Sequence, residues 1–203
     1  MLQICTVTSD TLELLIRLQS IPELADTRLV GGTALAFHLG HRLSIDLDLF
    51  GSFDQEIITK TLQSEGFNTF NILSESKVIK QYLINMVKID IVKYDRYPWL
   101  QDTVIDNQIR IAGLKDIAAM KVAAITNRGS KKDFIDLFFL LKTFTLQTII
   151  KFYLTKYFDA NLFTAIRSLA YFDDAEKDEM PKLLIPTKWE DVKDKIASEV
   201  KKI

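Results

Sequence analysis

The chain has 203 residues, of which 48% are hydrophobic and 26% charged, a balance typical of a globular protein with a substantial buried core. Its formal net charge of −1 excludes a global basic field that would draw it to nucleic acid, so any such contact must come from a local patch. The single cysteine, Cys5, excludes an intramolecular disulfide and a cysteine-based zinc site, and no segment is apolar enough for a signal peptide or a membrane span.

Helices and strands alternate in the first half of the sequence. A helix is expected over 11–18, with Ser9 or Asp10 as its N-cap. A short strand over 27–30 ends at two glycines, and a short helix over 33–39 ends at Gly40. The following segments are a strand over 44–50, a helix over 55–64 and strands over 67–73, 78–84 and 87–94, the last two forming a hairpin.

The second half of the sequence is helical. One extended piece over 108–111 precedes helices predicted over 114–126, 131–143, 146–157 and 160–171, and a final charged helix over 189–201. We therefore expect an α+β protein, with a mixed sheet and flanking helices in residues 1–112 and a helical domain in residues 113–203. The cysteine usage and the lack of a leader favour a cytoplasmic protein without membrane contact.

Two aspartates lie within the apolar strand predicted over 44–50. Because strand side chains alternate, Asp46 and Asp48 share one face. Ile45, Leu47 and Leu49 share the other face. Neighbouring carboxylates repel each other, and a divalent ion with oxygen ligands relieves that repulsion. A strand face open to water is the alternative explanation.

A glycine turn precedes this strand. Gly31 and Gly32 follow a strand and open a helix, where glycine lets the backbone approach a ligand closely. Backbone amides at the start of a helix favour an anion such as a triphosphate, and Thr33 adds a hydroxyl. A plain tight turn is the alternative.

The order of these two segments resembles the start of the DNA polymerase β nucleotidyltransferase superfamily, in which a strand, Gly-Gly-Thr, a helix and a strand with Asp-x-Asp follow one another. Twelve residues separate Thr33 from Asp46, within the spacing that the superfamily motif allows. The longer run GGTALAFHLGHRLSIDLDLF, with His41, Arg42 and Ser44, resembles the AbiEii/AbiGii-type toxin nucleotidyltransferases. The resemblance covers residues 28 to 142.

The resemblance also implies a third carboxylate on a later strand. Asp90 is the best candidate, because it is the acid inside the strongly apolar strand over 87–92. Asp95, just past that strand, is the weaker choice. The alternative for Asp90 is an isolated surface acid.

Basic residues concentrate between positions 110 and 132. This segment has six lysines and arginines and one acid, Asp116. Lys121 and Arg128 lie on one face of the predicted helix, and Lys121 leaves it among apolar neighbours. Such a lysine either extends its amine to water or binds an anion.

A second acidic pair begins the next helix. Asp133 and Asp136 are one turn apart and follow Lys132, where the toxin family commonly has arginine. The resemblance implies that Lys121, Asp133 and Asp136 complete the active site, although the residues alone leave open which aspartate acts and whether Asp133 instead caps its helix.

The resemblance implies a Mg²⁺-dependent enzyme that moves a nucleoside monophosphate from an NTP to an acceptor hydroxyl, with the helical domain completing the cleft. The metal ligands would be Asp46, Asp48 and Asp90, holding two Mg²⁺ ions, or Mn²⁺ in their place. The catalytic set would be Asp46, Asp48, Asp90, Lys121, Asp133 and Asp136. The nucleotide would be bound by Gly31, Gly32, Thr33, Arg42, Ser44, Lys121 and Arg128.

The acceptor stays open at this level. The toxin resemblance implies RNA, such as a tRNA 3′ end, and also a cognate antitoxin. A protein hydroxyl and a small molecule such as an aminoglycoside are the alternatives. A non-catalytic nucleotide-binding module with the same fold is a further alternative.

Overall fold

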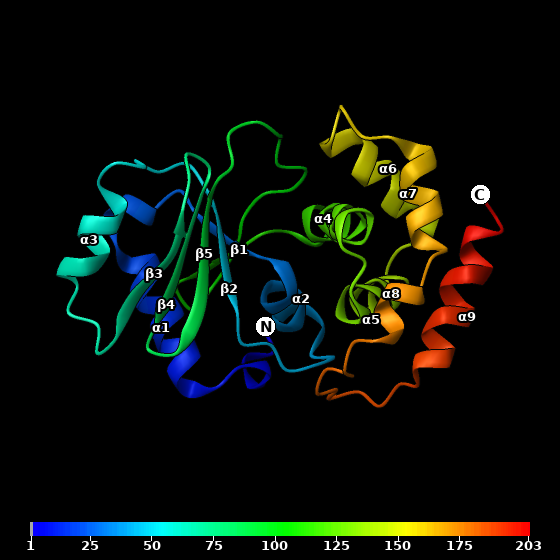
Figure 1. Cartoon of the computed structure of the whole chain (residues 1–203), viewed down its shortest axis with the longest axis horizontal. Coiled ribbons are helices and arrows are strands. Elements are labelled where there is room, and N and C mark those ends of the chain that lie inside the picture. Colours follow the sequence, from blue (N-terminus) through cyan, green and yellow to red (C-terminus); the bar gives the residue numbers. More distant parts are fainter. Residues whose placement is uncertain (1) are drawn as a thin grey trace.

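A seven-stranded mixed sheet forms one side of the molecule, seen in a computed structural model that describes residues 2–203 (Figure 1). The strand order is β3-β4-β5-β2-β1-β7-β6. β1 is antiparallel to β2, whereas β2 is parallel to β5 and β1 is parallel to β7. The strands are β1 Arg28–Val30, β2 Leu47–Gly51, β3 Phe70–Glu75, β4 Ile79–Ile84, β5 Val87–Lys93, β6 Val104–Asp106 and β7 Ile109–Ile111.

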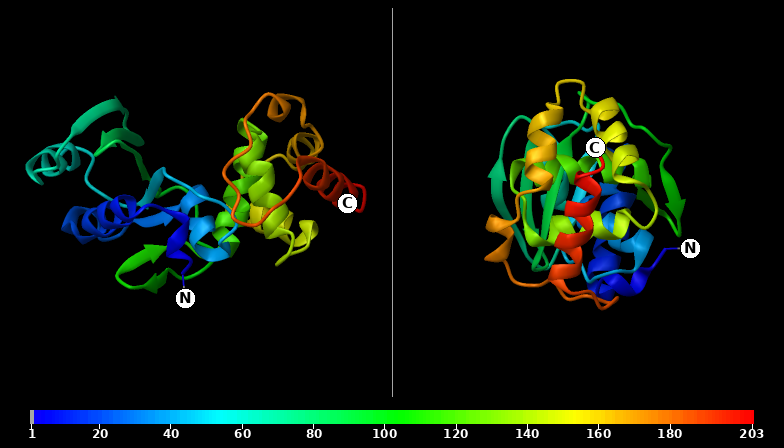
Figure 2. Two further views of the ribbon diagram at one scale, coloured as in Figure 1. Left: turned by 90° about the horizontal axis from the view of Figure 1, so that it is seen from below. Right: turned by 90° about the vertical axis from the view of Figure 1, so that its right-hand side faces the viewer.

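Helices α4 to α9 make up the other side of the molecule, α2 lies between the sheet and this helical side, and α1 and α3 lie beside the sheet at the opposite end (Figures 1 and 2). The α-helices are α1 Ser9–Ser20, α2 Gly31–Leu39, α3 Ile58–Ser64, α4 Leu114–Asn127, α5 Lys131–Leu140, α6 Leu146–Lys156, α7 Leu162–Leu169, α8 Asp173–Glu176 and α9 Trp189–Val200. Short 3-10 turns occur at Ile4–Thr6 and Pro22–Leu24.

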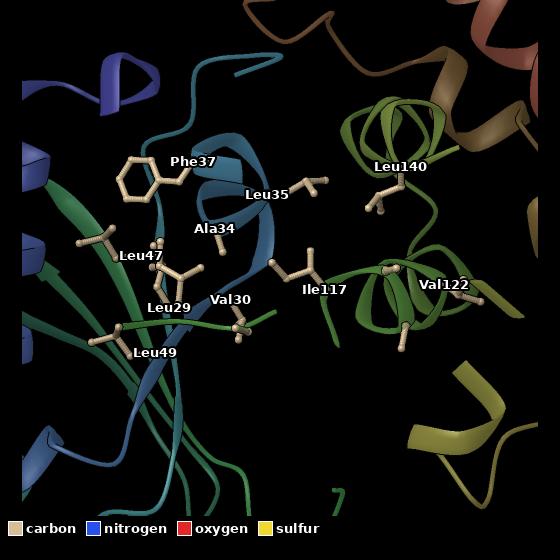
Figure 3. Packing of buried hydrophobic residues seen from close by; sticks show 14 of the residues in the cluster. Leu29, Val30, Ala34, Leu35, Phe37, Leu47, Leu49, Ile117, Val122 and Leu140 are labelled. Atoms are coloured by element: carbon tan, nitrogen blue, oxygen red, sulfur yellow. The ribbon is translucent and has the colours of Figure 1, made fainter. Parts of the chain in front are cut away.

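The apolar core continues from the sheet into the helices. Leu29 and Leu47 of the sheet are completely buried, and Leu35 of α2 points toward Ile117 of α4 and Leu140 of α5 (Figure 3). Helix α2 therefore contributes to the interior of both halves, and this fixes how α4 and α5 face the sheet. The division at residue 112 stays a prediction.

The predicted α+β architecture is confirmed. The hairpin of β4 and β5 turns at Asn85 and Met86, both with positive φ, as a tight two-residue hairpin requires. The sequence analysis missed β6, which pairs with β7 in a second hairpin, and it extended α5 beyond Leu140. No helix within residues 2–203 is long and apolar enough to cross a membrane.

The predicted strand over 44–50 is wrong at its start. β2 begins at Leu47, and Ile45 is 65% exposed instead of sharing the buried face of Leu47 and Leu49. The preceding segment is held by other partners, since the Leu43 N–H donates to the Lys182 carbonyl and the Ser44 N–H to the Thr6 carbonyl. These tertiary bonds replace sheet pairing before Leu47.

Candidate active site

Strand pairing brings the predicted carboxylates together at the centre of the sheet. Asp48 of β2 lies opposite Val30 of β1 on one side and opposite Asp90 of β5 on the other. A cavity of about 360 Å³ lies over this point, between the sheet and α4. Its lining includes every residue predicted for the site except Asp133 and Asp136, namely Gly31, Gly32, Thr33, Arg42, Ser44, Asp46, Asp48, Asp90, Lys121 and Arg128.

Two glycines leave room for the side chains of this cavity. Gly31 has a φ of +71°, and a Cβ added to it would lie 2.1 Å from Asp48 Oδ2. A Cβ on Gly32 would lie 2.3 Å from Arg42 Nη2. Both positions therefore need glycine, Gly31 for its backbone conformation as well as for space. The N-cap residue of α2, Val30, offers no side-chain acceptor, so no cap side chain occupies the first amides of this helix.

The Thr33 hydroxyl holds the loop that precedes β2. It donates to the Asp46 carbonyl and lies 2.8 Å from Ser44 Oγ. Thr33 is buried, so its hydroxyl links α2 to the aspartate-bearing loop. Its predicted contact with a triphosphate stays a prediction.

The three strand-side carboxylates differ in their surroundings. Burial raises the pKa of Asp48 to about 6, and the neighbouring Asp90 and Asp46 carboxylates add to this, whereas Lys121 and Lys88 oppose it. Asp90 is 3.2 Å from Lys88 Nζ and accepts a hydrogen bond from Gln81 at 3.1 Å. Asp46 has a looser partner, Lys132 Nζ, at 3.9 Å. Of the three carboxylates, Asp48 is therefore the one whose pKa is raised by burial and by the negative charge of its neighbours.

The donor set suits a hard divalent cation. Carboxylate oxygens are the ligands that Mg²⁺ prefers, and a cation beside Asp48 would oppose the burial and repulsion that raise its pKa. Within residues 2–203, however, no group of three acidic, histidine or cysteine side chains already converges on one point. Asp46 and Asp90 instead each lie near a lysine, Lys132 and Lys88 respectively.

Asp136 lies behind the opposite wall of the cavity, in a buried network of charges. It is completely buried and accepts two hydrogen bonds from Arg42, at 2.7 and 2.9 Å. His41 Nε2 lies 2.7 Å from its Oδ1, and Lys121 Nζ lies 2.6 Å from its Oδ2. Burial alone would raise the pKa of Asp136, but Lys121 and Arg42 hold that pKa well below its usual value.

Asp133 makes a similar set of contacts one helical turn earlier. It is bound by Lys121 at 3.1 Å and by Arg128 at 2.8 and 3.0 Å, and the Ser130 hydroxyl donates to it at 2.7 Å. Burial favours a raised pKa at Asp133, but Lys121 and Arg128 outweigh burial and hold the pKa low. Ser130, not Asp133, is the N-cap residue of α5.

The predicted residues thus separate into two layers. Arg42, Lys121 and Arg128 line the cavity, while Asp133 and Asp136 sit behind them and hold them in place. Lys121 is only 4% exposed and paired with both aspartates, so its amine does not extend into bulk water, and its predicted contact with a phosphate stays a prediction. Asp90 lies in the cavity, whereas Asp95 lies past β5 and pairs with Lys93.

Several cavity residues were not singled out from the sequence. Lys88 alternates with Asp90 along β5 and so had a local signal. Lys132, which was noted from the sequence only as the position where the family commonly has arginine, also lines the cavity. Asn127 and Tyr157 also line the cavity, but they come from the ends of separate helices and share no motif. His41, which contacts Asp136, was part of the family-like run without an assigned role.

Comparison with known proteins identifies a family model and a relative that match most of the chain. Residues 13–202 match a family model described as "Nucleotidyl transferase AbiEii toxin, Type IV TA system". An uncharacterised protein of Aquifex aeolicus (strain VF5), aq_aa25, is 38% identical over 184 residues, which cover 87% of this chain and 87% of that protein.

Solved structures share the fold at low sequence identity. JHP933 from Helicobacter pylori matches with a TM-score of 0.59 and 18% identity, over 96% of this chain and 92% of that chain. MenT4, the nucleotidyltransferase toxin Rv2826c from Mycobacterium tuberculosis H37Rv, matches with a TM-score of 0.54 and 16% identity, over 94% and 81%. ANT(2″)-Ia in complex with adenylyl-2″-tobramycin matches with a TM-score of 0.55 and 14% identity, over 72% and 95%.

Proposed function

This chain belongs to the AbiEii family of nucleotidyltransferase toxins of type IV toxin–antitoxin systems, and from that premise we propose that it transfers a nucleoside monophosphate from an NTP to a hydroxyl of an RNA acceptor, such as a tRNA 3′ end. The membership confirms the resemblance drawn from the glycine turn and the Asp-x-Asp strand. One observation carries the proposal: a single cavity combines the carboxylates of β2 and β5 with five cationic side chains, among them Arg42, Lys121 and Arg128.

The carboxylate side of the cavity would hold the metal on which enzymes of this family generally depend. Asp46, Asp48 and Asp90 would be the ligands of two Mg²⁺ ions, or of Mn²⁺ in their place. When bound, such ions neutralise phosphate charge and favour attack at the α-phosphorus by the acceptor hydroxyl. Asp90, which lies opposite Asp48 and lines the same cavity, would also take the proton of that hydroxyl.

The helical side of the cavity would hold the triphosphate. The amides at the start of α2, at Gly31 and Gly32, are without a capping side chain and line the cavity. Arg42, Lys121 and Arg128 would face the phosphate oxygens and stabilise charge that grows on the leaving pyrophosphate. Because the buried aspartates hold these cations in fixed positions, little reorganisation would accompany the reaction.

Asp133 and Asp136 fit a positioning role better than a direct catalytic one. Each is surrounded by cations that keep it ionised, and neither lines the cavity. Thr33 and Ser44 would shape the site by holding the Asp46 loop against α2. We also propose a cognate antitoxin as a partner, on the basis of family membership.

The test is transfer of label from each α-³²P-labelled NTP in the presence of total RNA and Mg²⁺, resolved on a denaturing gel. We expect one RNA class to be labelled with one preferred NTP, and no labelling by Asp46→Asn or Asp48→Asn. Label on a protein band, or on an added aminoglycoside with RNA unlabelled, would replace RNA as the acceptor. An NTP that binds without any transfer would indicate a non-catalytic module.

A further inference from the structure

Two further hollows adjoin the active-site cavity at the C-terminal turn of α4. The larger, of about 560 Å³, lies between this turn and α7. The smaller, of about 430 Å³, lies between the same turn and the loop that joins α6 to α7. Asn127 lines the active-site cavity and both hollows, so each hollow borders the cavity at this residue.

The larger hollow leads directly from the proposed triphosphate site. Arg128 lines both the active-site cavity and this hollow. Its guanidinium is fixed by two hydrogen bonds to Asp133, yet more than half of its side chain stays exposed. A ligand that lies in the hollow would therefore pass this guanidinium on its way to Asp48 and Asp90.

The side chains of the larger hollow suit a polyanion with flat rings. Arg167, an exposed residue of α7, adds a second guanidinium to that of Arg128. Tyr171 lines the hollow and is 51% exposed, which leaves its ring accessible for stacking. Arginine binds phosphate, and an exposed aromatic ring stacks on a base of any identity.

The charge of the hollow disfavours a polycationic acceptor such as an aminoglycoside. Its lining has two arginines and one carboxylate, Asp174, so it repels rather than attracts several ammonium groups. The smaller hollow is less suited to a polyanion, because its lining includes a carboxylate, Asp159. Arg96 binds this carboxylate at 2.7 Å, and the Tyr97 hydroxyl donates a hydrogen bond to it.

We propose that the larger hollow is the acceptor track: it binds the single-stranded end of the RNA, with Arg167 on a backbone phosphate and Tyr171 stacked on a base next to the reacting nucleotide, while Arg128 lies between the track and the triphosphate. This inference rests on the proposed transfer to RNA. The inference specifies where the acceptor lies: on the helical half, outside the cavity lined by the carboxylates that are proposed to bind metal.

The test compares steady-state transfer by Arg167→Ala and Tyr171→Ala with that of the intact protein, at varied RNA and saturating NTP. Each variant should raise the KM for RNA about tenfold, the scale of losing one stacked base or one phosphate contact. The dissociation constant for NTP and the unfolding temperature should not change, because both side chains are exposed and outside the nucleotide site. Tyr171→Trp should keep the KM of the intact protein, since indole also stacks.

Lys151→Ala is the matched control, because Lys151 is an exposed cation on α6 that lines neither adjoining hollow. If the intact protein labels RNA and both track variants behave like Lys151→Ala, the acceptor track is wrong while the transfer to RNA stands. If the intact protein labels no RNA and instead labels a protein or a small molecule, the proposed function fails and the track with it.

Discussion

At the scale of single residues, the site depends on two backbone positions, 31 and 32, that lie very close to functional side chains. The Asp48 carboxylate lies where a side chain at position 31 would be, and the Arg42 guanidinium lies where one at position 32 would be. Glycine at both positions therefore leaves the space that the Asp48 and Arg42 side chains occupy.

Gly31→Ala should remove both stability and activity. The φ of +71° is strained for alanine, which costs about 1–2 kcal/mol, and the new Cβ would collide with Asp48 Oδ2. Gly66→Ala separates the two effects, because Gly66 has a φ of +68° with nothing within 4 Å of an added Cβ. We expect both variants to lose stability in urea unfolding and only Gly31→Ala to lose nucleotide transfer. Equal transfer rates in the two variants would contradict this account of the glycine turn.

Asp48→Asn should abolish transfer and yet stabilise the protein in a chelator. The substitution removes a half-buried charge that faces Asp90 and Asp46. In the absence of metal we expect its unfolding temperature to rise by about 2–4 °C, equivalent to about 1 kcal/mol in a chain of this size. Mg²⁺ should raise the unfolding temperature of the intact protein and leave that of the variant unchanged.

Asp95→Asn is the control for this experiment, since Asp95 is exposed, lies just past β5 and pairs with Lys93. It should keep the response to Mg²⁺ and the transfer activity. A Mg²⁺ response in Asp48→Asn as large as that of the intact protein would place the metal elsewhere.

At the scale of elements, α4 and α5 act as a pair. Lys121 and Arg128 come from α4, and the aspartates that hold them come from the first turns of α5. The ions of this network are mostly removed from water, so each depends on its partners for compensation. The two aspartates of α5 therefore serve the site by holding its cations, and they do not line the cavity themselves.

Asp136→Asn should lower the free energy of unfolding by about 3–5 kcal/mol, because Arg42 and Lys121 would remain buried with one carboxylate fewer. Transfer should fall by about two orders of magnitude under conditions where the variant is folded, as expected for a displaced electrostatic stabiliser. Asp194→Asn, which removes an exposed acid of α9, should change neither quantity. Chemical denaturation together with single-turnover kinetics would check both effects, and a stable, fully active Asp136→Asn would exclude the positioning role.

At the scale of the whole molecule, buried ion pairs join the two halves. Arg42, which follows α2, binds Asp136 of α5. Lys156 of α6 binds Asp116 at 2.7 Å, and Asp116 also accepts the amides of Leu100 and Gln101 from the loop before β6. The chain near Leu183 crosses back to pair with residues 41–43, so the C-terminal region also secures the loop that carries Arg42.

The stability of this arrangement should depend on acid pH. Asp133 and Asp136 have folded-state pKa values below those of an unfolded chain, near 4, so their contribution is complete above about pH 4 and is lost as pH falls further. Thermal unfolding followed from pH 7 to about pH 1.5 should show a plateau and then a decline that begins near pH 4. Asp133→Asn should start from a lower plateau, and the difference from the intact protein should shrink progressively as pH falls below about 4. Parallel curves would show that these carboxylates do not govern acid unfolding.

The sequence by itself determined the elements and the chemistry that follow from local pattern. Period-two alternation located β5 and most of β2, the glycine pair marked the start of α2, and the Asp-x-Asp spacing led to the correct family. These features were readable because each depends on residues a few positions apart, whose relative geometry follows from the backbone itself.

Only the tertiary structure decided which charged groups face the cavity and which lie behind it. Lys121, Asp133 and Asp136 were all recognisable from their spacing, but burial and pairing depend on Arg42, which is 94 residues from Asp136 in the chain. The exposure of Ile45 and the hollow between α4 and α7 likewise arise from segments distant in sequence. Local periodicity contains no information on such contacts, because the energy of a buried charge is set by whatever partner the fold brings beside it.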